Sequence, residues 1–214
     1  MCKREEMHMG KDVYEERNSS YCYENTNTLI NKLDIRDSKV LQKYEAKITA
    51  AKLLALMQKG IIGNFDVKHI NAIHQYLFED IYPFAGKLRT ENIAKGVFRF
   101  AEWEYIEPEL ERLLNELKQE NYLDKLPKEK LAEGLAYYLS ELNVLHPYRE
   151  GNGRTTREFI RELALKNGYI LDLRKVSPKD FLNACIKSIV DTSDLTNLIH
   201  ECLTKKVYTQ NNAE

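Results

Sequence analysis

The chain has 214 residues, of which 43% are hydrophobic and 30% are charged, and its formal net charge is -1. This length and apolar content suit one domain with short appendages. The balanced charge provides no basic field for nucleic acid, and no apolar run approaches the roughly 20 residues of a membrane span. Residues 1–12 are polar and lack the apolar core of a secretion signal, so we expect a cytoplasmic protein with neither nucleic acid nor membrane as a partner.

Cysteine and histidine spacing gives no indication of a metal site. Four cysteines are spread along the chain: Cys2, Cys22, Cys185 and Cys202. They form no C-x-x-C pair and have no metal-ligand spacing, so reduced thiols are expected. His69 and His74 are five residues apart and do not share a helix face, which argues against zinc.

Residues 1–36 are predicted to be an N-terminal segment attached to the domain. Within it, residues 12–24 are consistent with a short helix. The domain itself is expected to span residues 37–206, because no linker marks a second domain. Residues 207–214 are expected to form a disordered polar tail.

A long helix is predicted over residues 38–59. Apolar residues recur there at helical spacing, Ser38 is a suitable cap, and Gly60 is typical of a helix end. Its inward face is expected to carry Leu41, Tyr44, Ile48, Ala51 and either Leu54 or Ala55.

A second helix is predicted to begin after Asp66, which can cap it. Its inward face is expected to carry Val67, Ile70, Ile73, Leu77 and Phe78. His74 lies near this apolar stripe. We expect it to be a core histidine with satisfied hydrogen bonds rather than a ligand or a base.

Helix periodicity stops over residues 87–101. Residues 88–93 and 97–100 are predicted to be two short strands joined by 94–96. A lone hairpin is marginally stable, so it must pack on the helices, and its free edge can bind an extended peptide by strand addition. The alternative is a simple connector, with four basic residues acting as solvated edge charges: Lys87, Arg89, Lys95 and Arg99.

The remainder of the chain is predicted to be helical, so the fold class is all-α with one small hairpin. Five further helices are predicted at 107–122, 128–145, 152–167, 178–190 and about 194–206. Pro108 is well placed in a first helical turn, and Pro127 precedes a helix that is apolar on several sides and therefore central.

Between two of these buried helices lies the polar segment HPYREGNGRTTR, residues 146–157. Gly151 and Gly153 permit positive φ and close approach of the backbone to a ligand. Successive N–H groups at the start of the following helix, together with its dipole, form an anion-binding concavity. Arg154 and Arg157 are three residues apart, so they share a helix face and suit contacts to phosphate oxygens.

Two further side chains of this loop complete the equipment of a nucleotide-dependent transferase. Glu150 is a hard oxygen ligand beside the predicted phosphate site, which favours Mg²⁺. His146 has a side chain whose ordinary pKa lies near neutrality, so it can accept a proton from a hydroxyl. The alternative is a plain turn followed by a solvated arginine face.

The loop resembles the signature of the Fic family, His-x-Phe-x-(Asp/Glu)-Gly-Asn-Gly-Arg-x-x-Arg, with Tyr148 at the position of Phe. Its ring is expected to anchor the loop, and its hydroxyl needs a partner or water. Residues 73–89, with the pattern IHxxLFxDIYxFAGKxR, are also similar to the family upstream of the signature. The resemblance implies a Fic-like helical bundle that transfers AMP from ATP to a Tyr, Thr or Ser hydroxyl of a target protein.

The resemblance also assigns roles to residues. His146 would be the catalytic base, and Glu150 would hold magnesium. The nucleotide-binding residues would be Gly151, Asn152, Gly153, Arg154 and Arg157. The hairpin would be a flap that docks the target as an extended segment, with Val97, Phe98 or Arg99 at its lip.

Residues 20–25, with the sequence SYCYEN, match the (Ser/Thr)-x-x-x-Glu-(Gly/Asn) pattern of the family's inhibitory motif. In that interpretation Ser20 and Glu24 are regulatory, and Glu24 occupies the arginine that ATP needs, Arg157. The protein would then be autoinhibited and self-modifying. In the alternative interpretation this segment only docks the N-terminus on the core, through Tyr21, Tyr23 and Thr26.

Other functions remain open on this scaffold. They include transfer of another phosphate-containing group, removal of AMP, a non-catalytic ATP-binding toxin-like module, and a helical scaffold without a ligand. The intact His146 favours chemistry, because a protein that only binds ATP does not need a base there. A homo-oligomer is also left open.

Overall fold

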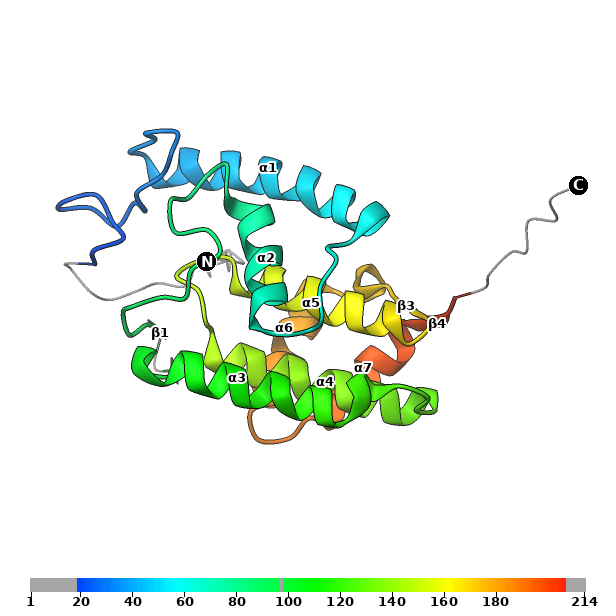
Figure 1. Ribbon diagram of the computed structural model, residues 1–214. Helices are drawn as coiled ribbons and strands as arrows, with labels where there is room; N and C mark the ends of the chain where they lie inside the picture. Colours follow the sequence, from blue (N-terminus) through cyan, green and yellow to red (C-terminus); the bar gives the residue numbers. More distant parts are fainter. Residues whose placement is uncertain (1–18, 97, 207–214) are drawn as a thin grey trace, which may run out of the picture.

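The structure is a computed structural model, and it describes residues 19–96 and 98–206 (Figure 1). Helices dominate these residues, as predicted: α1 (Ser38–Lys59), α2 (Val67–Phe78), α3 (Trp103–Gln119), α4 (Lys128–Leu145), α5 (Asn152–Lys166), α6 (Pro178–Lys187) and α7 (Ser193–Cys202). The strands are short: β1 (Ala94–Lys95), β2 (Phe98–Arg99), β3 (Tyr169–Leu171) and β4 (Leu203–Lys205). Two 3₁₀ turns complete the set, η1 (Asn121–Leu123) and η2 (Leu173–Lys175).

Helix α4 is the centre of the bundle, as its apolar sequence predicted. It packs against α3, α5 and α7, while α1 lies on the opposite side and packs against α2 (Figure 1). Its buried apolar residues are Leu131, Ala132, Leu135, Ala136, Tyr138, Leu139, Leu142 and Leu145. Burial of each large side chain contributes about 1.5–3 kcal/mol, so this helix fixes the position of the loop that follows it. Among the helices of the described residues, none combines the length and apolar character needed to cross a bilayer.

Several predicted helix ends are correct, and others differ from the prediction because a side chain caps the helix at another residue. Helix α1 has the predicted bounds, but Asp37 caps it in place of Ser38, since the Asp37 carboxylate accepts from the N–H groups at the helix start. Helix α3 begins before the predicted residue 107, because Asn92 accepts the N–H of Trp103 at 2.9 Å. Pro108 therefore lies inside the helix rather than in its first turn.

The predicted inward face of α1 is only partly correct. Leu41 is buried, but Tyr44 and Leu54 are 52% and 64% exposed. The inward face instead carries two polar side chains, Glu45 and Thr49. Apolar residues occur on both sides of this helix, so periodicity did not identify which side faces the core.

The strands also differ from the prediction. Residues 88–93 are not a strand; the antiparallel hairpin pairs Ala94 with Arg99 and Lys95 with Phe98. The predicted last helix ends at Cys202, and residues 203–205 form β4, which pairs with β3. Helix α6 ends at Lys187 rather than at 190. Pairing between distant segments leaves no local signal, which explains why β3 and β4 were not predicted.

Candidate active site

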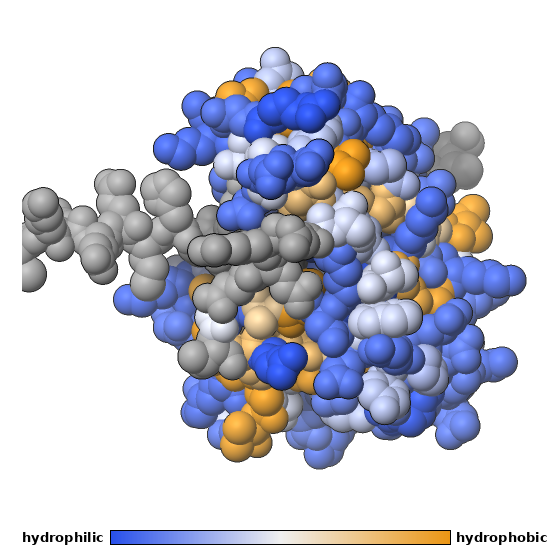
Figure 2. Space-filling view, turned by 90° about the vertical axis from the view of Figure 1, so that its left-hand side faces the viewer, coloured by the Kyte–Doolittle hydropathy of each residue, from blue (hydrophilic) through white to orange (hydrophobic). Residues whose placement is uncertain are grey.

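A cleft of about 1050 Å³ opens over the start of α5. It is bounded by the inward face of α1, the hairpin, the end of α4, the loop 146–151 and helix α6. Its volume is that of a site for a nucleotide-sized ligand. Figure 2 views the side of the molecule on which the hairpin lies; hydrophilic residues cover most of this face, and hydrophobic residues form separate patches, the largest of them at the lower left.

The loop before α5 is held in a single shape by its own residues. Gly151 has φ +82°, and a Cβ there would lie 2.2 Å from the Phe78 ring, so both the backbone and the space require glycine. Asn152 is buried, and its side chain accepts from the N–H of Tyr148 at 2.7 Å and donates to the Tyr148 carbonyl at 2.6 Å. These two bonds give Asn152 a role in loop shape beside its predicted role at the nucleotide.

The hydroxyl of Tyr148 has a hydrogen-bond partner, as the sequence analysis expected. The ring is buried and stacks on His74 with 3.8 Å between centroids, and the hydroxyl donates to Oδ1 of Asn71 at 2.8 Å. Burial raises the pKa of Tyr148, so the hydroxyl stays protonated and remains a donor. The replacement of Phe by Tyr at this position of the signature therefore adds a tether to α2.

His74 is a satisfied core histidine, as predicted, and it also holds the loop. The N–H of Gly86 donates to Nδ1 at 2.7 Å, so Nε2 carries the proton and donates to the Glu150 carbonyl at 3.0 Å. Burial, followed by the charge of Arg154, lowers the pKa of His74 to about 3. The imidazole is therefore neutral near neutral pH and acts as a structural bridge from α2 to the loop.

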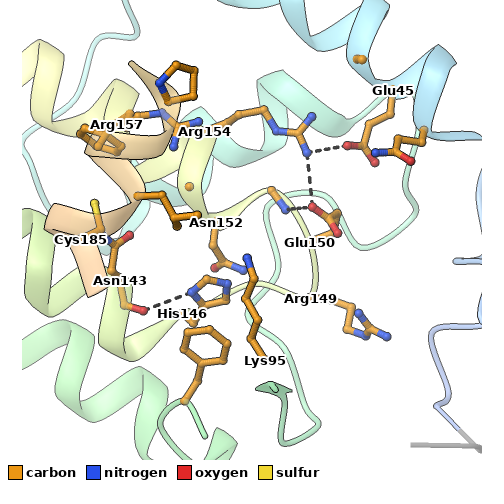
Figure 3. Close-up of a pocket in the computed structure, with 18 of the residues that line it drawn as sticks. Glu45, Lys95, Asn143, His146, Arg149, Glu150, Asn152, Arg154, Arg157 and Cys185 are labelled. Carbon is orange, nitrogen blue, oxygen red and sulfur yellow. Dashed lines mark hydrogen bonds and ion pairs between the residues drawn. The ribbon is translucent and has the colours of Figure 1, made fainter. Parts of the chain in front are cut away.

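His146 is oriented as a base at the edge of the cleft. Nδ1 lies 3.2 Å from the backbone carbonyl of Asn143, and because a carbonyl only accepts, Nδ1 carries the proton (Figure 3). Nε2 then has the lone pair that can accept a proton. The ring of Phe100 stacks on the imidazole with 3.8 Å between centroids and an interplanar angle of 18°. This stacking fixes the plane of the ring.

Arg89 supports the backbone at His146. Its side chain is 1% exposed, so it is not a solvated edge charge, which was one sequence interpretation. Nε donates to the His146 carbonyl at 2.8 Å, and the terminal nitrogens donate to carbonyls of Leu145, Glu91 and Ala101. The residue that caps the end of α4 is His146, whose backbone is left-handed with φ +47°. The guanidinium donates to backbone carbonyls that have no hydrogen-bond partner within the last turn of the helix.

The two predicted phosphate-binding arginines both line the cleft but point to opposite sides of it (Figure 3). Arg154 reaches α1, where Nη2 lies 2.5 Å from Oε1 of Glu45 and 3.3 Å from Oε1 of Glu150. Arg157 lies 5.8 Å from the centre of the Phe181 ring on α6. Burial, followed by the charge of Arg154, lowers the pKa of Arg157.

The hairpin contributes to the cleft, although not through all the residues predicted. Phe98 lines the cleft, together with Lys95, which the sequence analysis named only as a possible edge charge, and Phe100, which it did not name. Arg99 is exposed and is not part of the lining. The third predicted lip residue, Val97, lies outside the described residues.

The N-terminal segment docks on the core beside the loop. No helix forms over residues 19–24, so the predicted helix 12–24 is wrong there; residues 12–18 lie outside the described part. Ser20 donates through its N–H and hydroxyl to Glu91, and the hydroxyl of Tyr21 bonds to Thr90. These contacts agree with the docking interpretation.

Glu24 does not contact Arg157 in this structure. Its side chain is exposed, and among the residues described no hydrogen bond or ion pair joins it to that arginine. Two nearby residues fold the segment on itself: Tyr23 donates to the Asn31 carbonyl at 3.2 Å, and Thr26 donates to the Tyr23 carbonyl at 2.8 Å.

Comparisons with known proteins agree with this geometry. A sequence profile of the Fic/DOC family matches residues 64–164. The probable protein adenylyltransferase y4lH of Sinorhizobium fredii is 37% identical over 181 residues, which are 84% of this chain and 92% of that protein. The chain belongs to the Fic/DOC family.

Two further matches describe the extent of the likeness. The protein adenylyltransferase VbhT of Bartonella schoenbuchensis is 37% identical over 193 residues, which are 90% of this chain but only 40% of that longer protein. The crystal structure of BepC from Bartonella tribocorum, with bound AMPPNP, superposes with a TM-score of 0.82 at 25% identity. It covers 87% of this chain and 97% of the BepC chain, so the two chains share one fold over most of their length.

The residues present fit a magnesium ion that arrives with its nucleotide. In the part of the chain that the structure describes, no group of three or more His, Cys, Asp or Glu side chains is arranged to hold a metal. Magnesium is usually bound by one or two carboxylates together with substrate phosphates. Two carboxylates line the cleft, Glu45 and Glu150, and Glu150, in the loop before α5, meets that requirement.

Sequence reasoning missed four residues that shape the site: Glu45, Arg89, Phe100 and Asn143. Each acts through a partner that is distant in the sequence or through a backbone carbonyl. The only available signal was the match of residues 73–89 to the family, which includes Arg89 but does not say what it contacts.

Proposed function

We propose that this protein is a protein adenylyltransferase, which transfers AMP from ATP to a Tyr, Thr or Ser hydroxyl of a target protein. The observation that carries the proposal is the tautomer and position of His146, beside a loop that opens helix α5 and a cleft lined by two arginines. The names of VbhT and y4lH and the AMPPNP bound to BepC support the same activity.

In this proposal the loop binds the polyphosphate. N–H groups at 152 and 153 and the α5 dipole hold phosphate oxygens, while the N–H of Gly151 donates to Oε1 of Glu150 at 2.9 Å. Arg157 meets the terminal phosphate. Glu150 would hold a magnesium ion that arrives with ATP, and the ion would supply positive charge to the polyphosphate. The fixed loop stabilises charge that develops on the transferring group without reorganising during the reaction.

The chemical step uses His146 as the base. Nε2 accepts the proton of the target hydroxyl, whose oxygen forms a bond to the α-phosphorus of ATP. The bond from that phosphorus to the bridging oxygen breaks, and pyrophosphate leaves. The products are an adenylylated side chain and pyrophosphate. The stacked ring of Phe100 keeps the imidazole in the plane needed for this transfer.

The hairpin is proposed to dock the target. Its open edge offers backbone groups to an extended segment, which requires little of the target's sequence. Phe98 and Lys95 line the cleft beside His146, so a segment on the hairpin would present its hydroxyl to the base. We also place the reaction in the cytoplasm, where ATP is available and thiols such as Cys185 stay reduced.

The test is incubation of the protein with ATP and a cell lysate, followed by detection of labelled protein. Label from the α-phosphate is expected in a target band, and label from the γ-phosphate is not. The His146→Ala variant should abolish labelling while its affinity for an ATP analogue, measured by titration calorimetry, stays within twofold. Label from the γ-phosphate alone, or an active alanine variant, would overturn the proposal.

A further inference from the structure

A buried carboxylate on α1 is in contact with the site, although the proposed mechanism does not use it. Glu45 is 9% exposed, and its Oε1 lies 2.5 Å from Nη2 of Arg154. Its Oε2 accepts a hydrogen bond from the hydroxyl of Tyr82. Burial, followed by the charge of Glu45, raises the pKa of Tyr82, so this hydroxyl remains a donor. Both carboxylate oxygens are therefore held by specific partners.

Arg154 is fixed by groups from three different elements. On α1, Thr49 accepts from Nη1 at 3.1 Å and Glu45 accepts from Nη2. The Phe78 ring of α2 lies 4.7 Å below the guanidinium carbon. The loop contributes Glu150, whose oxygen is 3.3 Å from Nη2 and therefore makes the longer of the two contacts with a carboxylate.

The competition between the two carboxylates has a consequence for the site. Glu150 lies in the loop before α5, and its Oε1 accepts the N–H of Gly151 at 2.9 Å and lies 3.3 Å from Nη2 of Arg154. A guanidinium without another acidic partner would pair with Glu150 at two points and neutralise it. Glu45 prevents this, because it draws the guanidinium toward α1.

We propose that Glu45 is a positioning residue that holds Arg154 on α1 and so limits the pairing of Arg154 with Glu150, the carboxylate that the proposed function assigns to magnesium. This inference rests on the proposed function, because it assumes that a magnesium nucleotide binds at Glu150. Replacement of a buried ion pair by apolar residues is often neutral for stability, so fold stability alone does not explain a polar cluster on the inward face of α1.

The central experiment measures how a non-hydrolysable ATP analogue binds with and without magnesium, by titration calorimetry. In Glu45→Gln, the affinity with magnesium is expected to fall at least 10-fold, while the affinity without magnesium changes less than twofold. An unchanged affinity with magnesium would overturn the inference.

Asp37→Ala is the matched control. It removes the cap of the same helix and lowers the melting temperature, and Asp37 is not among the residues that line the cleft. Its affinities are expected to match those of the unsubstituted protein. If Asp37→Ala loses magnesium-dependent affinity as Glu45→Gln does, the effect is one of helix stability, and the inference fails.

A double-mutant cycle separates positioning from direct metal binding. In an Arg154→Met background, Glu45→Gln is expected to have no further effect on the affinity with magnesium. A second 10-fold loss there would identify Glu45 as a metal ligand itself and overturn the positioning role. If Glu45→Gln does not fold, Tyr82→Phe loosens the same carboxylate and should give a smaller loss of the same sign; no loss would count against the inference.

These affinity measurements test Glu45 whether or not the labelling experiment supports the proposed activity. If the unsubstituted protein binds the magnesium analogue but labels no protein from ATP, the adenylyltransferase proposal fails and the cycle still tests Glu45. If labelling succeeds and Glu45→Gln keeps its affinity, only the positioning role fails.

Discussion

Nε of Arg89 donates to the backbone carbonyl of His146 at 2.8 Å, so a side chain from the segment before the hairpin holds the backbone of the proposed base. The same guanidinium also donates to three other carbonyls. Residue 146 adopts a left-handed conformation that a non-glycine residue tolerates only when its surroundings fix it. Arg89 contributes to that restraint through its bond to the His146 carbonyl.

Arg89→Met should lower the free energy of unfolding by about 3 kcal/mol, because it leaves buried carbonyls without their charged donor. Chemical denaturation measures this change. Arg99→Met is the control, since Arg99 is exposed on the hairpin, and it should stay within about 0.5 kcal/mol of the unsubstituted protein. Equal losses in the two variants would show that the bonds of Arg89 contribute no more than a surface charge.

Tyr148→Phe restores the residue usual at this position of the signature and removes the bond to Asn71. The expected cost is about 1 kcal/mol, or a fall in melting temperature of roughly 2–4 °C for a domain of this size. The rate of transfer should be unchanged, because the stacked ring remains. Tyr44→Phe, at an exposed tyrosine of α1, should not move the melting temperature. A large loss of activity in Tyr148→Phe would contradict this assignment.

His74 should make the free energy of unfolding depend on pH below about 6.5. Its folded pKa of about 3 lies below the ordinary 6.5, so below pH 6.5 the unfolded chain binds a proton that the folded protein does not. This contribution to stability is complete above pH 6.5 and is lost as the pH falls toward 3. Between pH 7 and pH 5 the free energy of unfolding of the unsubstituted protein should fall by about 2 kcal/mol more than that of His74→Gln. Chemical denaturation at both pH values measures this difference. Parallel losses would show that His74 keeps its ordinary pKa.

Glu24→Gly should leave the transfer rate within twofold, because Glu24 is exposed and the segment docks through other residues. Labelling from the α-phosphate of ATP measures the rate. A rise of about 10-fold would instead support the inhibitory interpretation of residues 20–25.

Tyr21→Ala should lower the free energy of unfolding, since it removes an edge-on contact with Phe84 and the bond to Thr90.

The sequence predicted those parts of the molecule that depend on local order. The bounds of α1 and α4 and the loop between α4 and α5 followed from apolar spacing, proline and glycine, which act within a few residues. The prediction of the inward face of α1 was less accurate because Glu45 faces the core, where it meets Tyr82 and also Arg154, from a helix much later in the chain. Charged pairs of this kind have no period that a local pattern can reveal.

The same distinction applies to the site. The residues of loop 146–157 were recognised together because they are contiguous. The residues that hold this loop in place come from α1, α2 and the segment before the hairpin, including Glu45, His74 and Arg89. His74 was correctly predicted to be a core residue, but its bond to the Glu150 carbonyl depends on tertiary packing.

The closeness of Gly151 to Phe78 links two helices through a single aromatic ring. A methyl group at 151 would have to push that ring aside, and the guanidinium of Arg154 lies on the same ring. The disturbance would therefore reach the arginine and its two acidic neighbours without any direct contact between them and the new methyl. Residue 78 thus limits how the loop can vary: a smaller side chain there would make room at 151 but would remove the surface on which the arginine rests.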